Sequence, residues 1–293
     1  MPTIVVADEM EEDVLEMLSG VGKIVYKPSN IGVALTDADA LVVRSATRVT
    51  RELVENCKKL KVVARAGVGL DNIDIESCEK KGIKVFNTPG SSTEAVAELT
   101  IGLMICACRN VGKAHFGMKN GKWEKKKLTG FEIEGKTLGI IGYGRIGKAV
   151  AEKAVALGMR VIASDPTAKN DAYARIVSFQ ELLKESDIIS LHCNLTDATK
   201  GMINKEAIEM MRNGVVILNL ARGELINEDA LYDGCKSGKI YAVALDVYSA
   251  EPYKGKLLEL DNIIFTPHIG ASTQEAQKKI GVELVHKLKQ ELG

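Results

Sequence analysis

Three side chains in the second half of the sequence are of the types that reversible hydride transfer at a carbonyl group needs. Arginine holds a carboxylate beside that carbonyl through two parallel hydrogen bonds. Histidine donates a proton to the developing alkoxide and accepts it in the reverse direction. A glutamate bound to the other ring nitrogen favours the imidazolium and fixes its orientation. We call these residues the polar trio: Arg222, Glu251 and His268.

Each member of the polar trio also has a simpler explanation. A histidine after a strand is often a cap or a core residue, an arginine often forms a surface pair, and Glu251-Pro252 is typical of a turn. However, each of the three follows a strand-like apolar run, at 215–218, 241–245 and 263–265. Ligands of doubly wound sheets bind at the carboxyl ends of the strands, so the convergence favours a dehydrogenase site.

A glycine-rich run predicts where the second reactant binds. Gly142-Tyr143-Gly144-Arg145-Ile146-Gly147 follows the apolar run 138–141 and precedes apolar residues at helical spacing. In this context Gly142 allows a sharp turn, Gly144 lets a pyrophosphate approach the backbone, and Gly147 lets the helix pack against its strand. Glycines that serve helix packing alone are the alternative. The strand, turn and helix together favour a dinucleotide-binding fingerprint.

Asp165 ends the next apolar run, 160–164, where a dinucleotide site carries an acidic residue. An aspartate at this position accepts a hydrogen bond from a ribose hydroxyl and repels a ribose 2′-phosphate. We therefore expect NAD as the cofactor and a preference for NAD over NADP. Asp165-Pro166 is also compatible with a simple turn opener.

Alternating strands and helices predict the domains that position these residues. A doubly wound Rossmann sheet is expected from six strands, at 138–141, 160–164, 188–191, 215–218, 241–245 and 263–265. A second parallel α/β sheet is expected earlier, at 3–7, 23–26, 40–43, 62–64 and 84–86. An apolar helix over 92–110 leads into the Rossmann domain, and a last helix over about 272–291 returns to the first domain.

The predicted fold class is therefore α/β, with two doubly wound parallel sheets. We expect an NAD-binding Rossmann domain, residues 93–270, inserted in a flavodoxin-like substrate-binding domain, residues 1–92 plus 271–293.

The composition argues against other classes of function. The chain has 39 Lys and Arg against 39 Asp and Glu, so it lacks the basic surplus that nucleic acids and acidic membranes attract. It has no run of about 18 apolar residues that would span a bilayer. Its first residues are acidic where a signal peptide is basic. We expect a cytoplasmic protein.

Neither the cysteines nor the remaining histidines indicate a metal site. The six cysteines are scattered without metal-ligand spacing and are interpreted as buried packing residues: Cys57, Cys78, Cys106, Cys108, Cys193 and Cys235. His192 follows a strand and is compatible with shaping the cofactor pocket. His115 and His286 lie in helical stretches with lysines nearby, which is typical of solvated side chains.

Taken together, the motifs resemble those of the D-isomer-specific 2-hydroxyacid dehydrogenases. The resemblance rests on segments 142–147, 219–223, 246–252 and 267–271 and extends through nearly the whole chain. Within the family, the phosphoglycerate dehydrogenases are most similar, through segments 43–47, 65–74, 87–89 and 120–123. The resemblance implies a cleft that closes over NAD and substrate, and it gives the polar trio the catalytic roles described above.

The resemblance also implies contacts that residue types alone do not predict. On the cofactor side, Arg145 and Ile146 would contact the pyrophosphate and Asp246 would face the nicotinamide carboxamide, with Ala221 and Gly270 in the same pocket. The substrate side would be lined by Arg44, Ser45, Val68 and Gly69 together with Arg222 and His268.

The implied reaction is NAD-dependent oxidation of D-3-phosphoglycerate to 3-phosphohydroxypyruvate, which opens the phosphorylated route to serine. Arg44 and the Lys125-Lys126-Lys127 run are candidates for binding the phosphate, although such lysines are equally typical of a solvated face. A reductase for glyoxylate, hydroxypyruvate or another D-2-hydroxyacid is the alternative, because the same trio serves all of them. An NAD-sensing corepressor is the alternative of another class.

Regulation and assembly are further expectations from the resemblance. Many phosphoglycerate dehydrogenases carry a C-terminal domain that binds serine, whereas this chain has about 25 residues after His268. We expect no serine inhibition through such a domain, and we expect a homodimer formed through the 92–110 helix and its neighbours.

Overall fold

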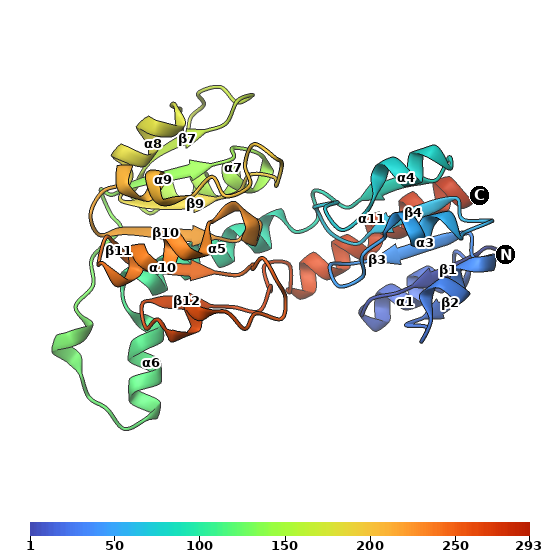
Figure 1. Cartoon of the computed structure of the whole chain (residues 1–293), viewed down its shortest axis with the longest axis horizontal. Coiled ribbons are helices and arrows are strands. Elements are labelled where there is room, and N and C mark those ends of the chain that lie inside the picture. The colour runs from blue at the N-terminus through green and yellow to red at the C-terminus, as the bar shows by residue number, and fades with distance from the viewer. The chain divides into compact units, whose positions relative to one another are not determined.

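The computed structural model describes residues 1–293, and the chain divides into two compact units. Unit 1 comprises Met1–Ala95 and Ala271–Gly293, whereas unit 2 is the continuous stretch Val96–Gly270. Helix α5 (Thr93–Cys108) contains the first boundary between the units. Both units alternate strands and helices along the chain (Figure 1).

Unit 1 is a five-stranded parallel sheet in the order β2-β1-β3-β4-β5. This is the flavodoxin-like strand order, as predicted. Its strands are β1 (Thr3–Val6), β2 (Lys23–Tyr26), β3 (Ala40–Val43), β4 (Val62–Arg65) and β5 (Lys84–Asn87). Its helices are α1 (Glu12–Ser19), α2 (Ile31–Ala34), α3 (Arg51–Glu55), α4 (Ile75–Lys80) and α11 (Gln274–Leu292), with a 3-10 turn, η1 (Leu35–Asp37).

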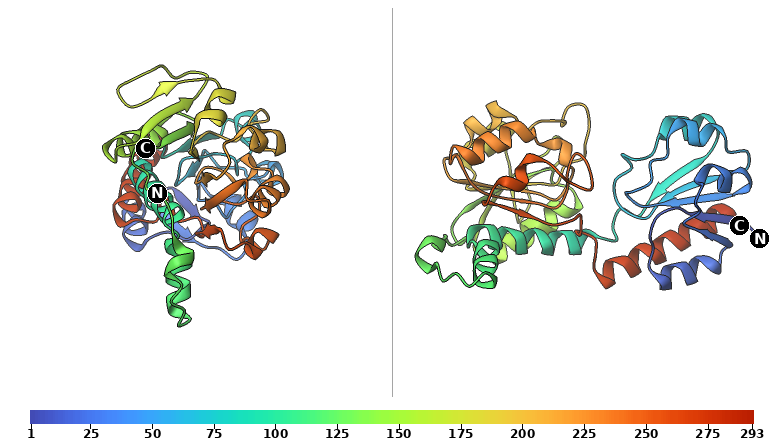
Figure 2. Two further views of the ribbon diagram at one scale, coloured as in Figure 1. Left: turned by 90° about the vertical axis from the view of Figure 1, so that its left-hand side faces the viewer. Right: turned by 60° about the horizontal axis from the view of Figure 1, so that its bottom comes forward.

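Helices cover both faces of the unit 1 sheet, which explains why its central strands are apolar without interruption. On one face, alternate strand residues pack against α1 and α11, with Ile280, Leu284 and Leu288 supplied by α11. The other face packs against α3 and α4 through Val54 and Cys78. Figure 2 shows α1 and α11 together on one side of this sheet.

Unit 2 is a seven-stranded parallel sheet in the order β12-β11-β10-β9-β6-β7-β8. The strands are β6 (Thr137–Ile141), β7 (Arg160–Ser164), β8 (Arg175–Ile176), β9 (Ile188–Leu191), β10 (Val215–Asn219), β11 (Ile240–Leu245) and β12 (Ile263–Phe265). The helices are α6 (Val111–Lys119), α7 (Arg145–Ala156), α8 (Phe179–Glu185), α9 (Lys205–Met210) and α10 (Glu228–Lys236). Three 3-10 turns complete it, η2 (Lys125–Leu128), η3 (Gly223–Leu225) and η4 (Lys256–Glu259).

The chain runs outward from β6 in one direction through β7 and β8, and in the other through β9 to β12. This reversal is the switch point of a Rossmann sheet, where a dinucleotide binds at the carboxyl ends of the strands. The sequence predicted six of the seven strands. It missed β8, whose two residues pair with β7 and are too few to produce an alternating pattern.

Small residues allow close packing on one face of the unit 2 sheet. The inward side of α7 consists of Gly147, Ala149, Val150, Ala151 and Ala154, all buried. Part of α5 packs in the same cluster through Leu103, Met104 and Ala107. The opposite face is covered by α8, α9 and α10, whose buried leucines and isoleucines form a second cluster.

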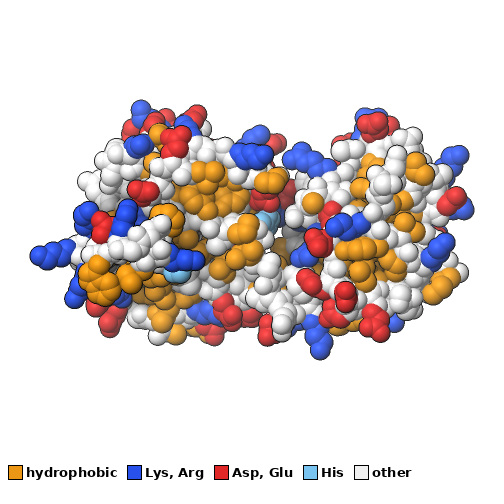
Figure 3. Space-filling model, turned by 90° about the horizontal axis from the view of Figure 1, so that it is seen from below, with side chains coloured by type: hydrophobic (Ala, Val, Ile, Leu, Met, Phe, Trp, Pro, Cys, Tyr) orange, Lys and Arg blue, Asp and Glu red, His pale blue; other side chains and the backbone are white.

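Helix α6 differs from the other helices of unit 2 because none of its residues is buried. It and the following segment project away from the unit 2 sheet (Figures 1 and 2). No single helix is long and apolar enough to cross a membrane; α5 and α6 together meet the length and composition test, but they are bent by 69°. Basic and acidic side chains are mixed over the face seen in Figure 3, in keeping with the balanced charge.

Candidate active site

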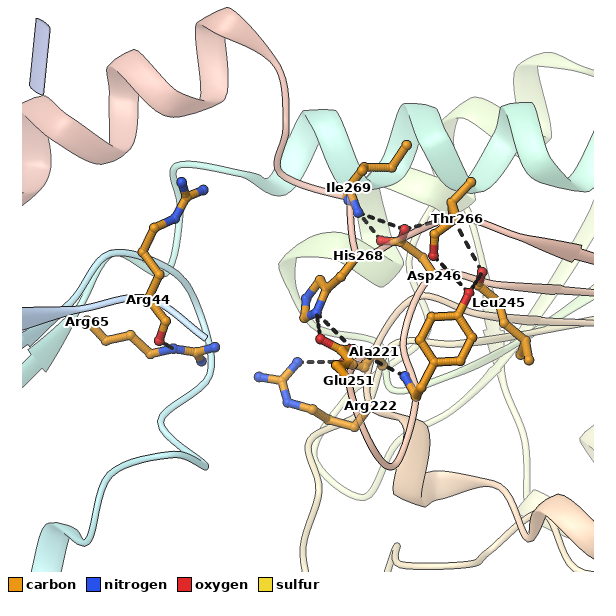
Figure 4. A network of polar contacts seen from close by, with 12 residues as sticks. Arg44, Arg65, Ala221, Arg222, Leu245, Asp246, Glu251, Thr266, His268 and Ile269 are labelled. Carbon is orange, nitrogen blue, oxygen red and sulfur yellow. Dashed lines mark hydrogen bonds and ion pairs between the residues drawn. The ribbon is translucent and has the colours of Figure 1, made fainter. Parts of the chain in front are cut away.

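The register of three adjacent strands places the polar trio at one edge of the unit 2 sheet. Asn219 at the end of β10 pairs with Leu245 at the end of β11, and Leu245 pairs with Phe265 at the end of β12. The segments that leave these strands therefore start at the same level. Arg222 comes from the first, Glu251 from the second and His268 from the third (Figure 4).

His268 and Glu251 form a hydrogen-bonded pair. The His268 Nδ1 atom lies 2.9 Å from Glu251 Oε2 and 3.1 Å from Oε1, and each side chain is about one third exposed, at 36% and 35%. The Tyr248 backbone N–H donates to Glu251 Oε1 at 3.3 Å, which helps to orient the carboxylate. Because Nδ1 is occupied by the glutamate, Nε2 is the ring atom left to exchange a proton with a substrate.

Partial burial alone would raise the pKa of Glu251, but its hydrogen bond to His268 and the nearby charges of His268 and Arg222 outweigh burial and lower it. Glu251 is therefore ionised at neutral pH and presents a negative charge to the imidazole ring. Figure 4 shows Arg222 beside the pair, where its positive charge contributes to the lowered pKa of Glu251.

The backbone of His268 adopts the left-handed conformation, with φ of 54°. A non-glycine residue in this region costs on the order of 1 kcal/mol, so neighbouring contacts must hold it there. Asp246, which is 1% exposed, supplies them. Its Oδ1 accepts from Thr266 Oγ1 at 2.7 Å and from the Ile269 N–H at 2.8 Å, and its Oδ2 accepts from the Gly270 N–H at 2.8 Å. Asp246 thus binds the loop on both sides of His268.

These bonds bear on the role expected of Asp246. A carboxylate has about four acceptor positions, and three donors from segment 266–270 occupy three of them. The contact to a nicotinamide carboxamide stays a prediction. The structure adds a second function for Asp246, which holds the loop that carries His268 and which the sequence did not predict.

Asn219 shapes the turn that carries Arg222. Its buried side chain accepts from the Ala221 N–H at 3.1 Å and donates to the Arg222 carbonyl at 2.8 Å. At Gly223 a Cβ atom would lie 2.0 Å from the Tyr248 carbonyl carbon, so only glycine lets this turn approach the segment that leads to Glu251. The motif 219–223 is therefore needed to position the arginine as well as to supply it.

A stack of three aromatic rings supports the Glu251 loop from the other side. Tyr248 and Tyr253 stack with centroids 4.8 Å apart, and both stack on Phe265 of β12. The Tyr248 hydroxyl lies 2.8 Å from the Thr266 carbonyl and 3.1 Å from the Leu245 carbonyl. The rings thus connect the two loops that carry Glu251 and His268. This support involves residues that sequence spacing does not single out.

Two glycines of the fingerprint have the backbone geometry predicted for them, whereas the approach of a pyrophosphate to Gly144 stays a prediction. Gly142 has φ of 91°, and a Cβ there would lie 2.4 Å from the Cys193 nitrogen. A Cβ on Gly147 would lie 2.3 Å from the Gly142 carbonyl oxygen, whereas one on Gly144 would meet nothing within 4 Å. Gly144 therefore borders open space at the start of α7, which no side chain caps. Arg145 and Ile146 begin this helix, so its N-terminus fits a pyrophosphate.

Asp165 follows β7 at the same edge of the sheet. Its Oδ2 accepts from the Tyr143 N–H at 2.9 Å, and its Oδ1 accepts from the Thr167 N–H at 2.8 Å and the Ala168 N–H at 3.1 Å. Burial would raise the pKa of Asp165, but these hydrogen bonds together lower it, so the carboxylate is ionised. The turn-opener interpretation and the ribose interpretation are thus compatible, because Asp165 shapes its loop and keeps a negative charge.

Other residues near this edge are less suited to proton transfer. Burial lowers the pKa of His192 to about 4, and its Nε2 lies 2.8 Å from Ser190 Oγ. Burial raises the pKa of the Cys193 thiol to about 11. His192 is therefore neutral at pH 7, and its effect on the cofactor pocket stays a prediction. The structure holds no group of three or more His, Cys, Asp or Glu side chains arranged to bind a metal ion.

Unit 1 carries the residues predicted for the substrate side. Arg44 follows β3, and its N–H donates to Asp8 Oδ2 at 2.5 Å. The Arg44 carbonyl accepts from Asn72 Nδ2 at 2.9 Å and from Arg65 Nε at 3.1 Å. Arg65 also donates to the Gly69 carbonyl, and Asn87 donates to the Val68 carbonyl.

The loops that contain Arg44, Ser45, Val68 and Gly69 are therefore joined at the carboxyl edge of the unit 1 sheet. The residues that hold them, Asp8, Asn72 and Arg65, were not predicted as site residues. The lysine run lies elsewhere, in η2 of unit 2, where Lys127 pairs with Glu124 at 2.7 Å.

Unit 2 thus has the strand order, the glycine turn and the acidic ribose position of an NAD-binding Rossmann domain, with a histidine, glutamate and arginine at the same sheet edge. The family model for the D-isomer specific 2-hydroxyacid dehydrogenase, NAD binding domain, matches residues 101–270. The chain belongs to the D-isomer-specific 2-hydroxyacid dehydrogenase family, and unit 2 is its NAD-binding domain.

Two curated relatives illustrate the range of activities nearby. A hydroxypyruvate reductase of Thermotoga maritima is 53% identical over 264 residues, which is 88% of this chain and 86% of the relative. A D-3-phosphoglycerate dehydrogenase of Methanocaldococcus jannaschii is 46% identical over the full chain, which covers 58% of that relative. The chain thus spans somewhat more than half the length of this phosphoglycerate dehydrogenase.

The fold is also that of solved family members. The D-lactate dehydrogenase of Aquifex aeolicus, solved with NAD and lactic acid, has a TM-score of 0.88 and 33% sequence identity, covering 98% of this chain and 94% of its own. A glyoxylate reductase from Paecilomyes thermophila has a TM-score of 0.91 at 31% identity, covering 99% and 95%. These neighbours confirm the predicted fold class.

Proposed function

We propose that the chain is an NAD-dependent dehydrogenase that interconverts a D-2-hydroxyacid and its 2-oxoacid, with D-3-phosphoglycerate as the substrate. The observation that carries this proposal is the pair formed by His268 and the ionised Glu251, which lie 2.9 Å apart at the sheet edge that also carries Arg222. A proton-transfer group, its orienting carboxylate and a cation for the substrate carboxylate are the groups that this reaction needs.

Each side chain then has a distinct task. His268 accepts the hydroxyl proton at Nε2 during oxidation and returns it during reduction. Glu251 fixes the ring through Nδ1 and stabilises the imidazolium. Arg222 binds the substrate carboxylate next to the reacting carbon. Bound NAD supplies the hydride acceptor, and the start of α7 with Asp165 would hold it.

Support for a phosphorylated substrate comes from unit 1. The backbone of Arg44 is held through both its N–H and its carbonyl, which presents the guanidinium at the end of β3. Its side chain contacts the Glu9 carbonyl oxygen at 3.3 Å, a neutral acceptor that leaves the positive charge unpaired. We propose that Arg44 binds the substrate phosphate while Arg222 binds the carboxylate. Ser45, Val68 and Gly69 would line the same side.

A second candidate function is reduction of hydroxypyruvate or glyoxylate. The relative from Thermotoga maritima, named a hydroxypyruvate reductase, is 53% identical and is matched over 86% of its length. The polar trio serves either substrate equally well, so the two candidates differ only in whether a phosphate is bound.

The deciding experiment is NADH oxidation with 3-phosphohydroxypyruvate beside hydroxypyruvate, glyoxylate, 2-oxoglutarate and pyruvate. We expect kcat/KM for the phosphorylated acid to exceed the others about a hundredfold, which corresponds to some 2.7 kcal/mol of transition-state discrimination. Arg44→Met should remove most of this preference and leave hydroxypyruvate turnover unchanged. Equal or better turnover of an unphosphorylated acid by the unaltered enzyme would favour the reductase.

We also propose that the enzyme is a homodimer. Large apolar side chains are exposed on and after α6, with Phe116 71%, Met118 56% and Trp123 79% accessible. Apolar side chains at this density are typical of a surface that a partner covers. Light scattering behind a sizing column should give twice the chain mass of 31.7 kDa, and Phe116→Asp with Trp123→Asp should shift it toward the monomer.

A further inference from the structure

Tyr143 occupies the variable position between the first two glycines of the fingerprint and is 2% exposed. It belongs to a core cluster of unit 2, where a phenylalanine would pack equally well. Its two polar groups both bind acidic residues of the segment that follows β7. The backbone N–H donates to Asp165 Oδ2 at 2.9 Å, and the hydroxyl donates to Asp171 Oδ1 at 2.9 Å.

Asp171 lies near the end of this segment and accepts several of its hydrogen bonds. Its Oδ1 also accepts from the Tyr173 N–H at 2.9 Å and the Ala174 N–H at 3.1 Å, which closes a tight turn just before β8. Lys148 of α7 lies 3.9 Å from Asp171 Oδ2 and 5.5 Å from the Tyr143 ring centroid. The Tyr173 and Ala174 amides, Tyr143 and Lys148 together lower the pKa of Asp171 against the effect of burial, so the tyrosine hydroxyl meets a full negative charge.

The segment 165–174 therefore has two attachments to one residue of the phosphate-binding turn. The first fixes Asp165, the residue expected to bind the adenosine ribose, and the second fixes the end of the loop, through Asp171. In a Rossmann domain the loop after the second strand borders the adenosine half of the dinucleotide. A change in this loop would thus reach the cofactor without touching the polar trio.

We propose that Tyr143 and Asp171 are a positioning pair that holds the 165–174 loop against the phosphate-binding turn and so sets the affinity for the adenosine half of NAD. Without the pair, the loop samples more conformations, and binding must order it again. The pair affects the affinity for NAD. It has no part in proton or hydride transfer.

The test is Tyr143→Phe, which removes the hydroxyl and keeps the ring. We expect the Kd for ADP-ribose, measured by calorimetry, to rise about tenfold because a hydrogen bond to a charged acceptor is lost. KM for NADH should rise by a similar factor, with kcat within about twofold of the unaltered enzyme. Asp171→Ala should raise the Kd at least as much, because it also removes the acceptor of the Tyr173 and Ala174 N–H groups. The double variant should bind ADP-ribose no more weakly than Asp171→Ala alone.

Tyr173→Phe is the matched control, because Tyr173 lies on the same loop and contacts Asp171 through its backbone N–H. It should leave the Kd for ADP-ribose unchanged. A Tyr143→Phe enzyme with a lower melting temperature but an unchanged Kd would overturn the proposal and leave the hydroxyl a purely structural role. ADP-ribose binding needs no hydroxyacid, so this result is independent of the proposed substrate.

Discussion

The His268 loop of unit 2 and the Arg44 loop of unit 1 are held in a similar way, but the two side chains are fixed to different degrees. In each, a buried aspartate accepts backbone N–H groups from the loop that carries the side chain. Asp246, 1% exposed, holds the His268 loop, and Asp8, 6% exposed, holds the Arg44 loop. The difference lies in the side chains. His268 is itself fixed by Glu251, whereas Arg44 has one long contact to a carbonyl oxygen.

This difference matches the tasks that we propose. Proton transfer needs a ring held at a defined distance and angle, because misplacement by about 1 Å can cost a hundredfold in rate. Binding an anion by its charge tolerates a mobile guanidinium. Variants that misplace the His268 ring should therefore lower kcat, whereas variants that loosen the Arg44 loop should raise KM.

The largest effect is expected for His268→Gln. Loss of the proton-transfer group should lower kcat about a thousandfold in both directions of the reaction, with the affinity for NADH unchanged. Steady-state kinetics and NADH fluorescence titration measure the two quantities. The control is His115→Gln, which alters an exposed histidine of α6 and should leave kcat and the affinity for NADH unchanged. A kcat within tenfold of the unaltered enzyme would remove His268 from the proposed role.

Asp246→Asn should lower kcat about a hundredfold without removing any group that we propose to exchange a proton. The amide keeps the shape of the side chain but turns a donor toward either the Ile269 or the Gly270 N–H, which would release the left-handed His268 backbone. Asp261→Asn, at an exposed site before β12, is the matched control. If kcat survives in a folded Asp246→Asn enzyme, the loop does not depend on this carboxylate.

Glu251→Gln should move the pH profile as well as lower the rate about tenfold. Without the negative charge of its partner, the protonated ring is less stabilised, so the profile for oxoacid reduction should move toward lower pH. The profile of kcat for reduction measures this, with Glu206→Gln on α9 as the control. An unmoved profile would contradict the orienting role.

The lowered pKa of Glu251 also bears on stability. Its ordinary value is 4.5, so the pairing stabilises the folded chain above that pH and is lost as the pH falls through the lowered pKa. Acid unfolding of Glu251→Gln should accordingly depend less on pH in this range.

The smallest effect is expected in unit 1. Asp8→Ala should raise KM for the phosphorylated substrate several-fold, about three- to tenfold, with kcat unchanged, because the Arg44 and Thr47 N–H groups lose their acceptor. Asp8→Asn should be milder, since its amide oxygen can replace Oδ2 and its amide nitrogen can donate to Thr47 Oγ1. A fall in kcat at constant KM would show that the two units do not divide the tasks as we propose.

Much of this architecture follows from sequence patterns that are local. The apolar runs predicted the strands, and the polar trio could be gathered because parallel strands end at a common edge. The turn at Gly142 and the close packing at Gly147 were predicted because the glycine spacing between a strand and a helix is a local signal.

The supports of the site could not be predicted in this way. Asp8 and Thr47 are 39 residues apart, and Asp246 and Gly270 are 24 residues apart. Such contacts depend on tertiary packing, and any buried aspartate after a strand has the same sequence signature. The roles of Asp246 and Tyr143 therefore emerge only when the loops are seen together.

The division of unit 1 between the two ends of the chain has a consequence for biosynthesis. Once Gly270 has been synthesised, every residue of unit 2 is present. The unit 1 sheet at that stage lacks α11, whose Ile280, Leu284 and Leu288 cover one of its faces. At Gly281 a Cβ would lie 2.6 Å from Val14 of α1, so the two helices interlock closely. On the ribosome, the strands of unit 1 are made before α11, so one face of their sheet stays uncovered until α11 is made. Exposed apolar surface favours aggregation during this interval.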